Sequence, residues 1–507
     1  MSRDRLFVRE IRVVGSTVFT AEDLSKVVAP YEGRELAVED FEEARLALTR
    51  LYVDRGYVNS GAILPDQTVS DGVVTIQIIE GELSRIEVTD NRWFRESHLR
   101  RRVEPGARTP LNVNELRHQL QLLQQDPRIK RIDSELKPGL RLGESVLALR
   151  VEEVRPYRLL LDVNNYHNPA VGEIGGSITL QHQNLTGHGD VLSLGYGRTE
   201  GVNPQLDFRY SIPLTARDTT FGFQYRKNDF VIVTETFQDL DITSESEIFG
   251  FTLRHPVYRT IRQEFGLELT GERLSNTTFV LGERFSLFPG AEDGEMIVTA
   301  LRISADWLYR TRKFVLAARS RFSLGVDALG ATIHNSSQGP DGRYFAWLGQ
   351  FQWVQRLPFW DSQLIFRADI QRADDALLAL EQAAVGGRYS VRGYREVTAL
   401  RDSTVIASLE SRVPLISQRR WADYIEIAPF VDFADATNVK SANGDDDIRL
   451  ASIGMGLRWA VTTPGPGPFR LRPQFEVYWG YRLLERDRQG SELQDHGVHL
   501  QLTVAAF

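Results

Sequence analysis

Three arginines lie within one short glycine-rich stretch, GGRYSVRGYRE, which runs from Gly386 to Glu396. Arginine carries five N–H donors in a rigid planar fork, and glycine allows backbone angles that other residues avoid. Such a loop could bind phosphate, bind nucleic acid, or pair with a carboxylate elsewhere in the same fold. A phosphate cradle at Gly386 and Gly387 is disfavoured, because no Lys-Ser/Thr pair follows and no helix is expected to begin there.

The composition excludes several classes of protein. The 507 residues carry a formal net charge of -8, which argues against nucleic acid as the main partner. Cysteine is absent, which excludes thiol catalysis, disulfides and cysteine metal sites. The nine histidines form no short-spaced cluster of the kind that binds a metal. We therefore expect no enzyme activity, no metal site and no cofactor. The acidic run Asp445, Asp446 and Asp447 is interpreted as a solvated loop and not as a calcium site.

Residues 6–82 predict the order strand, helix, helix, strand, strand. The stretch from Thr20 to Asp23 resembles a capping box before a short helix, and apolar residues at helical spacing predict a longer helix over 38–54. The apolar positions before Thr20 alternate with charged ones, which is typical of a strand and not of a signal-peptide core. We expect a small α+β domain.

Residues 83–155 repeat this order, so the chain contains an internal repeat. Helices are predicted around 96–103 and from Asn112 onward. On the second of these helices, a stripe of three leucines is interpreted as domain core in preference to a substrate groove: Leu116, Leu120 and Leu123.

Residues 156–507 contain no convincing amphipathic helix and no run of 18 apolar residues, so a transmembrane helix is excluded. The segments instead alternate apolar and polar residues with a period of two. We predict sixteen strands over 158–166, 173–183, 190–199, 204–212, 218–228, 245–255, 263–273, 296–308, 313–326, 343–355, 362–372, 402–412, 424–434, 449–461, 470–481 and 497–507.

Alternation alone fits both a soluble multi-sheet protein and a membrane barrel. Three features favour a transmembrane β-barrel: the strands are long enough to cross a bilayer, aromatic residues gather at strand ends, and short connections alternate with long ones. The long loops are predicted over 229–244, 274–295, 327–342, 373–401, 435–448 and 484–495. The arginine-rich stretch falls in the sixth loop on that side, 373–401.

Two motifs resemble a known family. GYVNSGAILPDQTVSDGVVTIQIIEGEL, from Gly56 to Leu83, resembles the end of the first POTRA domain of TpsB-type two-partner secretion transporters. VRGY, from Val391 to Tyr394, resembles the signature of the sixth extracellular loop in the wider superfamily of POTRA-barrel transporters and insertases. The resemblance spans essentially the whole chain and implies two periplasmic POTRA domains, 6–82 and 83–155, followed by a 16-stranded antiparallel barrel, 156–507.

The resemblance also implies a function. Such transporters lie in the outer membrane of Gram-negative bacteria and secrete one large β-helical exoprotein, of the haemolysin type among others, without nucleotide hydrolysis. The POTRA domains receive the unfolded exoprotein, which carries an N-terminal secretion domain. The implied partners are this exoprotein, outer-membrane lipid, and the barrel-assembly machinery during biogenesis, and the protein is expected to be a monomer. The alternatives are a barrel-assembly insertase of the same superfamily, whose members usually carry more POTRA domains, and a passive porin.

In this superfamily the sixth loop folds back into the barrel, and its arginine meets an aspartate of an FxDxG strand motif. The candidate here is PFVDFAD, residues 429–435. Strand parity selects Asp432, because Asp435 has the parity of the lipid-facing residues. Arg392 is therefore expected to pair with Asp432, with Gly393 allowing a tight turn and Tyr394 packing its ring. Ala434 replaces the family glycine, so the close backbone approach expected at that position is in doubt.

The last residue, Phe507, resembles the C-terminal aromatic residue that the barrel-assembly machinery recognises. Its parity is opposite to that of the apolar face of the last strand, which carries Val498, Leu500, Leu502 and Val504. A bulge near the chain end could restore the match.

Overall fold

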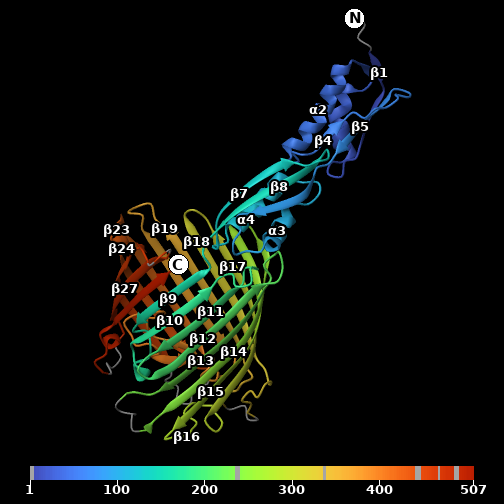
Figure 1. Cartoon of the computed structure of the whole chain (residues 1–507). Coiled ribbons are helices and arrows are strands. Elements are labelled where there is room, and N and C mark those ends of the chain that lie inside the picture. The colour runs from blue at the N-terminus through green and yellow to red at the C-terminus, as the bar shows by residue number, and fades with distance from the viewer. Residues whose placement is uncertain are drawn as a thin grey trace. The chain divides into compact units, whose positions relative to one another are not determined.

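The computed structural model describes residues 5–234, 240–334, 339–439, 447–465, 467, 469–484 and 490–507. The chain divides into two compact units, Met1–Arg155 and Pro156–Phe507 (Figure 1). Among the described residues, no helix has both the length and the apolar character needed to cross a bilayer.

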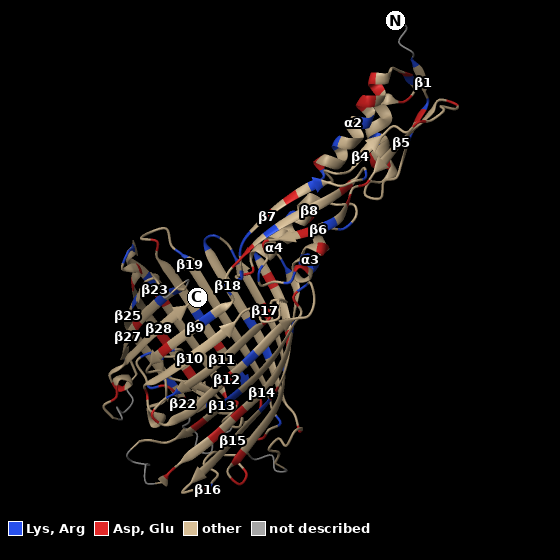
Figure 2. Ribbon diagram, in the orientation of Figure 1, with Lys and Arg blue, Asp and Glu red and all other residues tan. Residues whose placement is uncertain are grey.

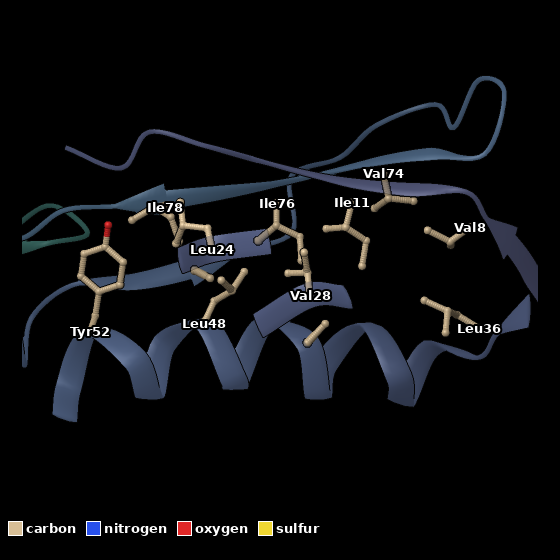
Figure 3. Close-up of a cluster of buried hydrophobic side chains, with 12 residues drawn as sticks. Val8, Ile11, Leu24, Val28, Leu36, Leu48, Tyr52, Val74, Ile76 and Ile78 are labelled. Atoms are coloured by element: carbon tan, nitrogen blue, oxygen red, sulfur yellow. The ribbon is translucent and has the colours of Figure 1, made fainter. Parts of the chain in front are cut away.

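The first small domain packs two helices against a three-stranded sheet of order β2-β5-β4, while β1 pairs with β3. Its elements are β1 (Leu6–Val8), β2 (Glu10–Val14), α1 (Ala21–Val28), β3 (Arg34–Leu36), α2 (Val38–Asp54), β4 (Gly61–Ile63) and β5 (Val73–Ile79). Thr20 caps α1 in a capping box with Asp23, as the sequence predicted. One face of α2 buries Leu48 and Tyr52 against Ile76 of the sheet (Figure 3).

The second small domain repeats this arrangement with a sheet of order β6-β8-β7, in which β7 is an edge strand. Its elements are β6 (Glu82–Thr89), α3 (Glu96–Val103), α4 (Val113–Gln124), β7 (Ile129–Pro138) and β8 (Glu144–Glu153). Leu116 and Leu123 of α4 are buried in the core, in agreement with the sequence interpretation. Leu120 is only partly buried, and together with Leu116 it lines a groove of about 350 Å³ between α4 and β7.

The second unit is a closed antiparallel barrel, in which β28 pairs with β9. The described residues of this unit form sixteen long strands in the barrel, which confirms the predicted number. They are β9 (Tyr157–Asn164), β10 (Gly175–His182), β11 (Val191–Arg198), β12 (Val202–Pro213), β13 (Thr220–Val231), β14 (Thr243–Arg259), β15 (Gln263–Val280), β17 (Glu295–Arg310), β18 (Phe314–Gly325), β19 (Phe345–Arg356), β20 (Gln363–Ala373), β23 (Ser403–Arg419), β24 (Ala422–Thr437), β25 (Ile448–Ala460), β27 (Arg470–Arg482) and β28 (Val498–Ala506). The two-residue strands β16 (Glu283–Arg284) and β26 (Thr463–Pro464) extend these ladders.

Several strands are longer than predicted. β15 continues to Val280, and β23 continues to Arg419 past a register shift between Pro414 and Ile416. Beyond the apolar band the alternation of residue type fades, but antiparallel backbone pairing needs no apolar face and continues. The sixth loop (residues 374–402, loop 6 below) also contains a hairpin that the sequence did not indicate, formed by β21 (Ala383–Val385) and β22 (Ala399–Arg401).

The two faces of the barrel wall differ in character. On β24 the large apolar side chains of Val431 and Phe433 are exposed on the outer face, while the alternating residues Phe430 and Asp432 are buried on the inner face. Charged residues occur along the wall strands, as the coloured segments on β11 to β15 show (Figure 2). Many form ion pairs, for example Arg254 with Glu264. This is the pattern of apolar outside and polar inside that a membrane barrel requires.

Candidate functional site

Loop 6 lies inside the barrel, because it contacts wall strands on both sides of the lumen. Its Glu381 reaches Arg302 of β17, whereas Gly393 approaches Gly480 of β27. The arginine motif, defined as residues 386–396, forms the second half of this loop. Gly386, Gly387 and Gly393 all have positive φ angles, which glycine adopts without strain, so the chain can turn back on itself here.

Arg392 is the central residue of the motif and is almost fully buried. Its Nε donates to Asp432 Oδ2 at 2.8 Å and its Nη2 donates to Asp432 Oδ1 at 2.8 Å, which makes a bidentate pair. Nη1 donates to Glu410 of β23, and Nη2 also donates to Ser408. The guanidinium carbon lies 3.5 Å from the centroid of the Phe430 ring. Arg392 is therefore held by charge, by directional hydrogen bonds and by stacking at once.

The two aspartates of β24 occupy different environments, as strand parity predicted. Asp432 is 1% exposed and also accepts the backbone N–H of Arg392 at 3.0 Å. Asp435 lies near Arg449 of β25, with 35% of its side chain exposed. The structure thus brings Asp432, and not Asp435, to Arg392.

Gly393 lies where two backbones meet. A Cβ atom on Gly393 would lie 2.7 Å from the carbonyl oxygen of Gly480, which real side chains do not tolerate. The N–H of Gly393 donates to Nε2 of the buried His499 on β28 at 3.2 Å. The glycine that follows Arg392 is therefore required both by its positive φ of 95° and by contact with the wall.

Tyr394 is buried and fixes the loop through both parts of its side chain. Its hydroxyl lies within hydrogen-bond distance of the carbonyl oxygens of Leu484, at 2.7 Å, and Ala451, at 3.1 Å, and shares its one proton between them. Its ring belongs to a cluster that includes Val391 and the fully buried Ala434. The close backbone approach that was in doubt at Ala434 occurs at Gly480 instead, and the extra methyl group at Ala434 packs against the loop.

The other two arginines of the motif also pair with carboxylates, which the sequence analysis did not anticipate. Arg388 donates to Glu476 of β27 at 3.0 Å, and its guanidinium carbon lies 3.9 Å from the centroid of the Tyr478 ring. Arg395 makes a bidentate pair with Asp495 in the loop before β28, at 2.6 and 2.7 Å. The sequence signal for a role of these two arginines in holding the loop was their presence in the same glycine-rich motif as Arg392. Their partners lie about 90 and 100 residues further along the chain, Glu476 on β27 and Asp495 in the loop before β28, so the motif alone could not identify them.

Phe507 pairs with Arg470 through two backbone hydrogen bonds, of 3.1 and 2.9 Å. The register between β27 and β28 runs without a shift from Trp479 opposite Val498 to Leu471 opposite Ala506. The bulge that could have restored the parity of Phe507 is therefore not present in this ladder.

The described residues contain no group of three or more His, Cys, Asp or Glu side chains able to hold a metal ion. Asp445 and Asp446 of the acidic run lie outside the described residues, and Asp447 directly precedes β25.

Comparison with known protein families identifies the family of this chain. Residues 143–459, more than half of the chain, match the family described as haemolysin secretion/activation protein ShlB/FhaC/HecB. Residues 6–81 match the ShlB-type POTRA domain. The chain belongs to the ShlB/FhaC/HecB family. It is an outer-membrane transporter of the TpsB type.

Individual members of the ShlB/FhaC/HecB family show how far the similarity extends. The outer membrane transporter CdiB of Dickeya dadantii is 24% identical over 77% of this chain and 69% of its own length. The hemolysin transporter protein ShlB of Serratia marcescens is 26% identical over 82% of this chain and 75% of its own length. Both relatives are transporters by name.

Solved structures share the fold of this family member. CdiB from Escherichia coli superimposes with a TM-score of 0.71 over 99% of this chain and 91% of its own, at 20% identity. BamA from Haemophilus ducreyi lacking POTRA domains 1–3 gives a TM-score of 0.57 over 99% of this chain and 100% of its own, at 15% identity. At these identities the likeness establishes the architecture alone.

Proposed function

We propose that this family member recognises an unfolded β-helical exoprotein through its two POTRA domains, 6–82 and 83–155, and secretes it to the cell surface. The observation that carries the proposal is the family match over 143–459, which includes barrel strands β9 to β24 and all of loop 6. The relatives are named as transporters, and we propose that transport here involves neither catalysis nor a cofactor.

The second POTRA domain supports the recognition step through its edge strand. β7 pairs with β8 along one side, and on its other side the Gln124 side chain binds the backbone at Lys130 and Ile132. The rest of that side can pair with an extended chain by main-chain hydrogen bonds. The adjacent groove supplies apolar contacts through Leu120 and Leu136 and polar ones through Arg117 and Gln121. Such a site demands little of the substrate sequence, which suits an unfolded exoprotein.

We further propose that Arg392, Gly393, Tyr394 and Asp432 form a lock that keeps the arginine motif in its working position. The support is the complete burial of the contact: removing one partner of a buried ion pair generally costs about 3–5 kcal/mol, because the other charge is left without a counter-ion. A loop inside a wet lumen needs such a contact to keep its position while a polypeptide passes beside it.

The test is secretion by an Arg392→Ala strain. We expect at least tenfold less exoprotein in the medium at unchanged outer-membrane levels of the barrel. Arg319→Ala is the matched control. It also removes an arginine from an ion pair on the inner wall, the pair with Asp306, but both of these residues belong to wall strands and neither to loop 6. Wild-type secretion by Arg392→Ala, with normal barrel levels, would overturn the lock.

A strain depleted of the protein distinguishes the insertase alternative. If the protein inserted other barrels, its depletion would lower the levels of unrelated outer-membrane proteins and leave a co-expressed exoprotein unaffected. We propose that the exoprotein, with its N-terminal secretion domain, is the main partner, that the transporter acts as a monomer, and that the barrel-assembly machinery recognises Phe507 during biogenesis.

A further inference from the structure

The first half of loop 6 has a contact with the wall that is separate from the arginine motif. Glu381 accepts two hydrogen bonds from Arg302 of β17, from Nη2 at 2.7 Å and from Nη1 at 3.0 Å. The two side chains are 8% and 7% exposed. Here the polarity is the reverse of the Arg392 contact: the loop supplies the carboxylate and the wall supplies the arginine.

Apolar packing accompanies this ion pair. Leu377 and Leu378 of loop 6 are buried, and they pack into an apolar cluster on the inner wall. The wall side of this cluster is formed by Leu274, Met296, Val298, Ala300, Tyr344 and Ala346. Residues 377–382 therefore form a second docking segment, which we call the proximal segment. In the chain, β21 follows the proximal segment, and the arginine motif lies between β21 and β22.

The two contacts differ in what remains on the wall when the loop departs. Without Glu381, Arg302 keeps Glu272 of β15 at 2.7 Å and the Ser323 hydroxyl at 2.8 Å, so its charge stays paired. Departure of Arg392 would instead remove three N–H donors from the buried Asp432. An unpaired buried charge is the more costly result.

The surroundings of the proximal contact also favour its release. A cavity of about 210 Å³ borders Arg302 and Glu381 and is lined by the polar side chains of Arg321, Gln371 and Gln382. A space of this size with polar walls can hold several water molecules, which would solvate the separated charges.

We propose that Glu381 and Arg302 form a second, independent anchor of loop 6, and that the proximal segment can leave the wall while the arginine motif stays bound. Glu381 and Arg302 are positioning residues in this scheme. Loop 6 is then held at two contacts with the wall, and release of the proximal segment alone widens the lumen. This movement rests on the proposed export of an exoprotein through the barrel, and residues 377–382 are the part of loop 6 that moves.

The absence of cysteine from the chain allows a direct test with single-cysteine reporters in the full-length protein. Ala379→Cys reports on the proximal segment, where Ala379 packs at the edge of the apolar cluster. Ser390→Cys reports on the arginine motif, where the Ser390 hydroxyl is buried. The measured quantity is the rate at which a small maleimide labels the single thiol of each reporter in barrels reconstituted in lipid vesicles.

Glu381→Gln removes the charge of the anchor and retains the size of its side chain. We expect it to raise the labelling rate of the Ala379→Cys reporter at least fivefold and to leave that of the Ser390→Cys reporter within twofold. Arg392→Ala should produce the opposite pattern. Asp306→Asn is the matched control, because it also neutralises an inner-wall carboxylate, one that faces Arg319 and Arg254, and it should change neither rate.

Equal acceleration of both reporters by Glu381→Gln would overturn the proposal, since the loop would then move as one unit. Unchanged labelling of the Ala379→Cys reporter would overturn it as well, since the ion pair would not hold the segment. If Glu381→Gln lowers barrel yield, Leu378→Ala weakens the apolar packing of the same segment, and equal acceleration of both reporters by that variant would likewise overturn the proposal. Labelling does not require export, so a failure to secrete any exoprotein would contradict the proposed function and leave the labelling result intact.

Discussion

Gly393 of loop 6 and Gly480 of β27 pack backbone against backbone inside the barrel. A Cβ atom on Gly480 would lie 2.8 Å from the carbonyl carbon of Arg392, and one on Gly393 would lie 2.7 Å from the Gly480 oxygen. The loop therefore reaches the depth at which Arg392 meets Asp432 only because both residues lack a side chain. The position of the charged contact depends on a steric one.

Gly480→Ala should displace the arginine motif without altering any charge. Overpacking of this kind typically costs about 1–3 kcal/mol, because the backbone must shift to relieve the clash. We expect greater channel conductance in planar lipid bilayers, together with reduced export. Gly271→Ala is the control, since a Cβ atom there has no neighbour within 4 Å. Identical conductance of the two variants would show that the glycine contact does not set the position of the loop.

Arg388→Met should destabilise the barrel by about 3 kcal/mol, the lower end of the range for breaking a buried ion pair, because Arg458 continues to face Glu476 at 3.3 Å. The measurement is the urea dependence of folding in lipid vesicles. Arg209→Met provides the comparison, because the Arg209 side chain is 54% exposed in its pair with Asp207 and should contribute only about 0–1 kcal/mol. Equal effects of the two substitutions would contradict the structural distinction between them.

Leu120→Lys should impair secretion and leave the second POTRA domain folded, because Leu120 lines the groove beside β7 and is only partly buried. A charge there removes apolar contact with the passing chain, and we expect about a tenfold loss of exported protein, equivalent to about 1.4 kcal/mol of binding free energy. Leu140→Lys is the matched control, since Leu140 lies fully exposed in the turn after β7 and outside the groove. Normal export by Leu120→Lys would exclude this groove as a substrate site.

Asp126 should make the stability of the second POTRA domain dependent on acid pH. Burial acts to raise the pKa of Asp126, but hydrogen bonds and charge from Arg128 outweigh it and hold the pKa below its ordinary value of 3.8. A depressed carboxyl pKa contributes stability that is fully present above the unfolded value and is lost as pH falls through the folded one. Stability should therefore fall below about pH 4.

The matching variant is Asp126→Asn. It should cost about 1.5–3 kcal/mol at pH 7, the usual contribution of hydrogen bonds to a charged group, and the difference from wild type should shrink below pH 4. Trp93 is the single tryptophan within residues 1–155. In a fluorotryptophan-labelled full-length protein, the ¹⁹F signal of Trp93 therefore reports on this domain during urea titration. A difference that is independent of pH would contradict the assigned ionisation.

The sequence by itself determined the architecture, because periodicity is a local property. The alternation of apolar and polar residues along each strand predicted the number of strands correctly, and apolar residues at helical spacing predicted the helix over 38–54 that buries Leu48 and Tyr52. Strand parity was enough to distinguish Asp432 from Asp435, since side chains alternate between the two faces of a strand. The periodicity did not predict the last part of β23, from residue 413 to Arg419, because Pro414 and a register shift interrupt the alternation there.

Only the tertiary structure decided how loop 6 is held beyond the pair of Arg392 and Asp432. The partners of Arg388 and Arg395, Glu476 and Asp495, lie about 90 and 100 residues further along the chain, and Glu381 finds Arg302 about 80 residues earlier. No local pattern encodes such pairings, because closure of the barrel brings these strands around one lumen. The sequence identified the motif that carries the charge, and the closed wall determined where each charge is neutralised.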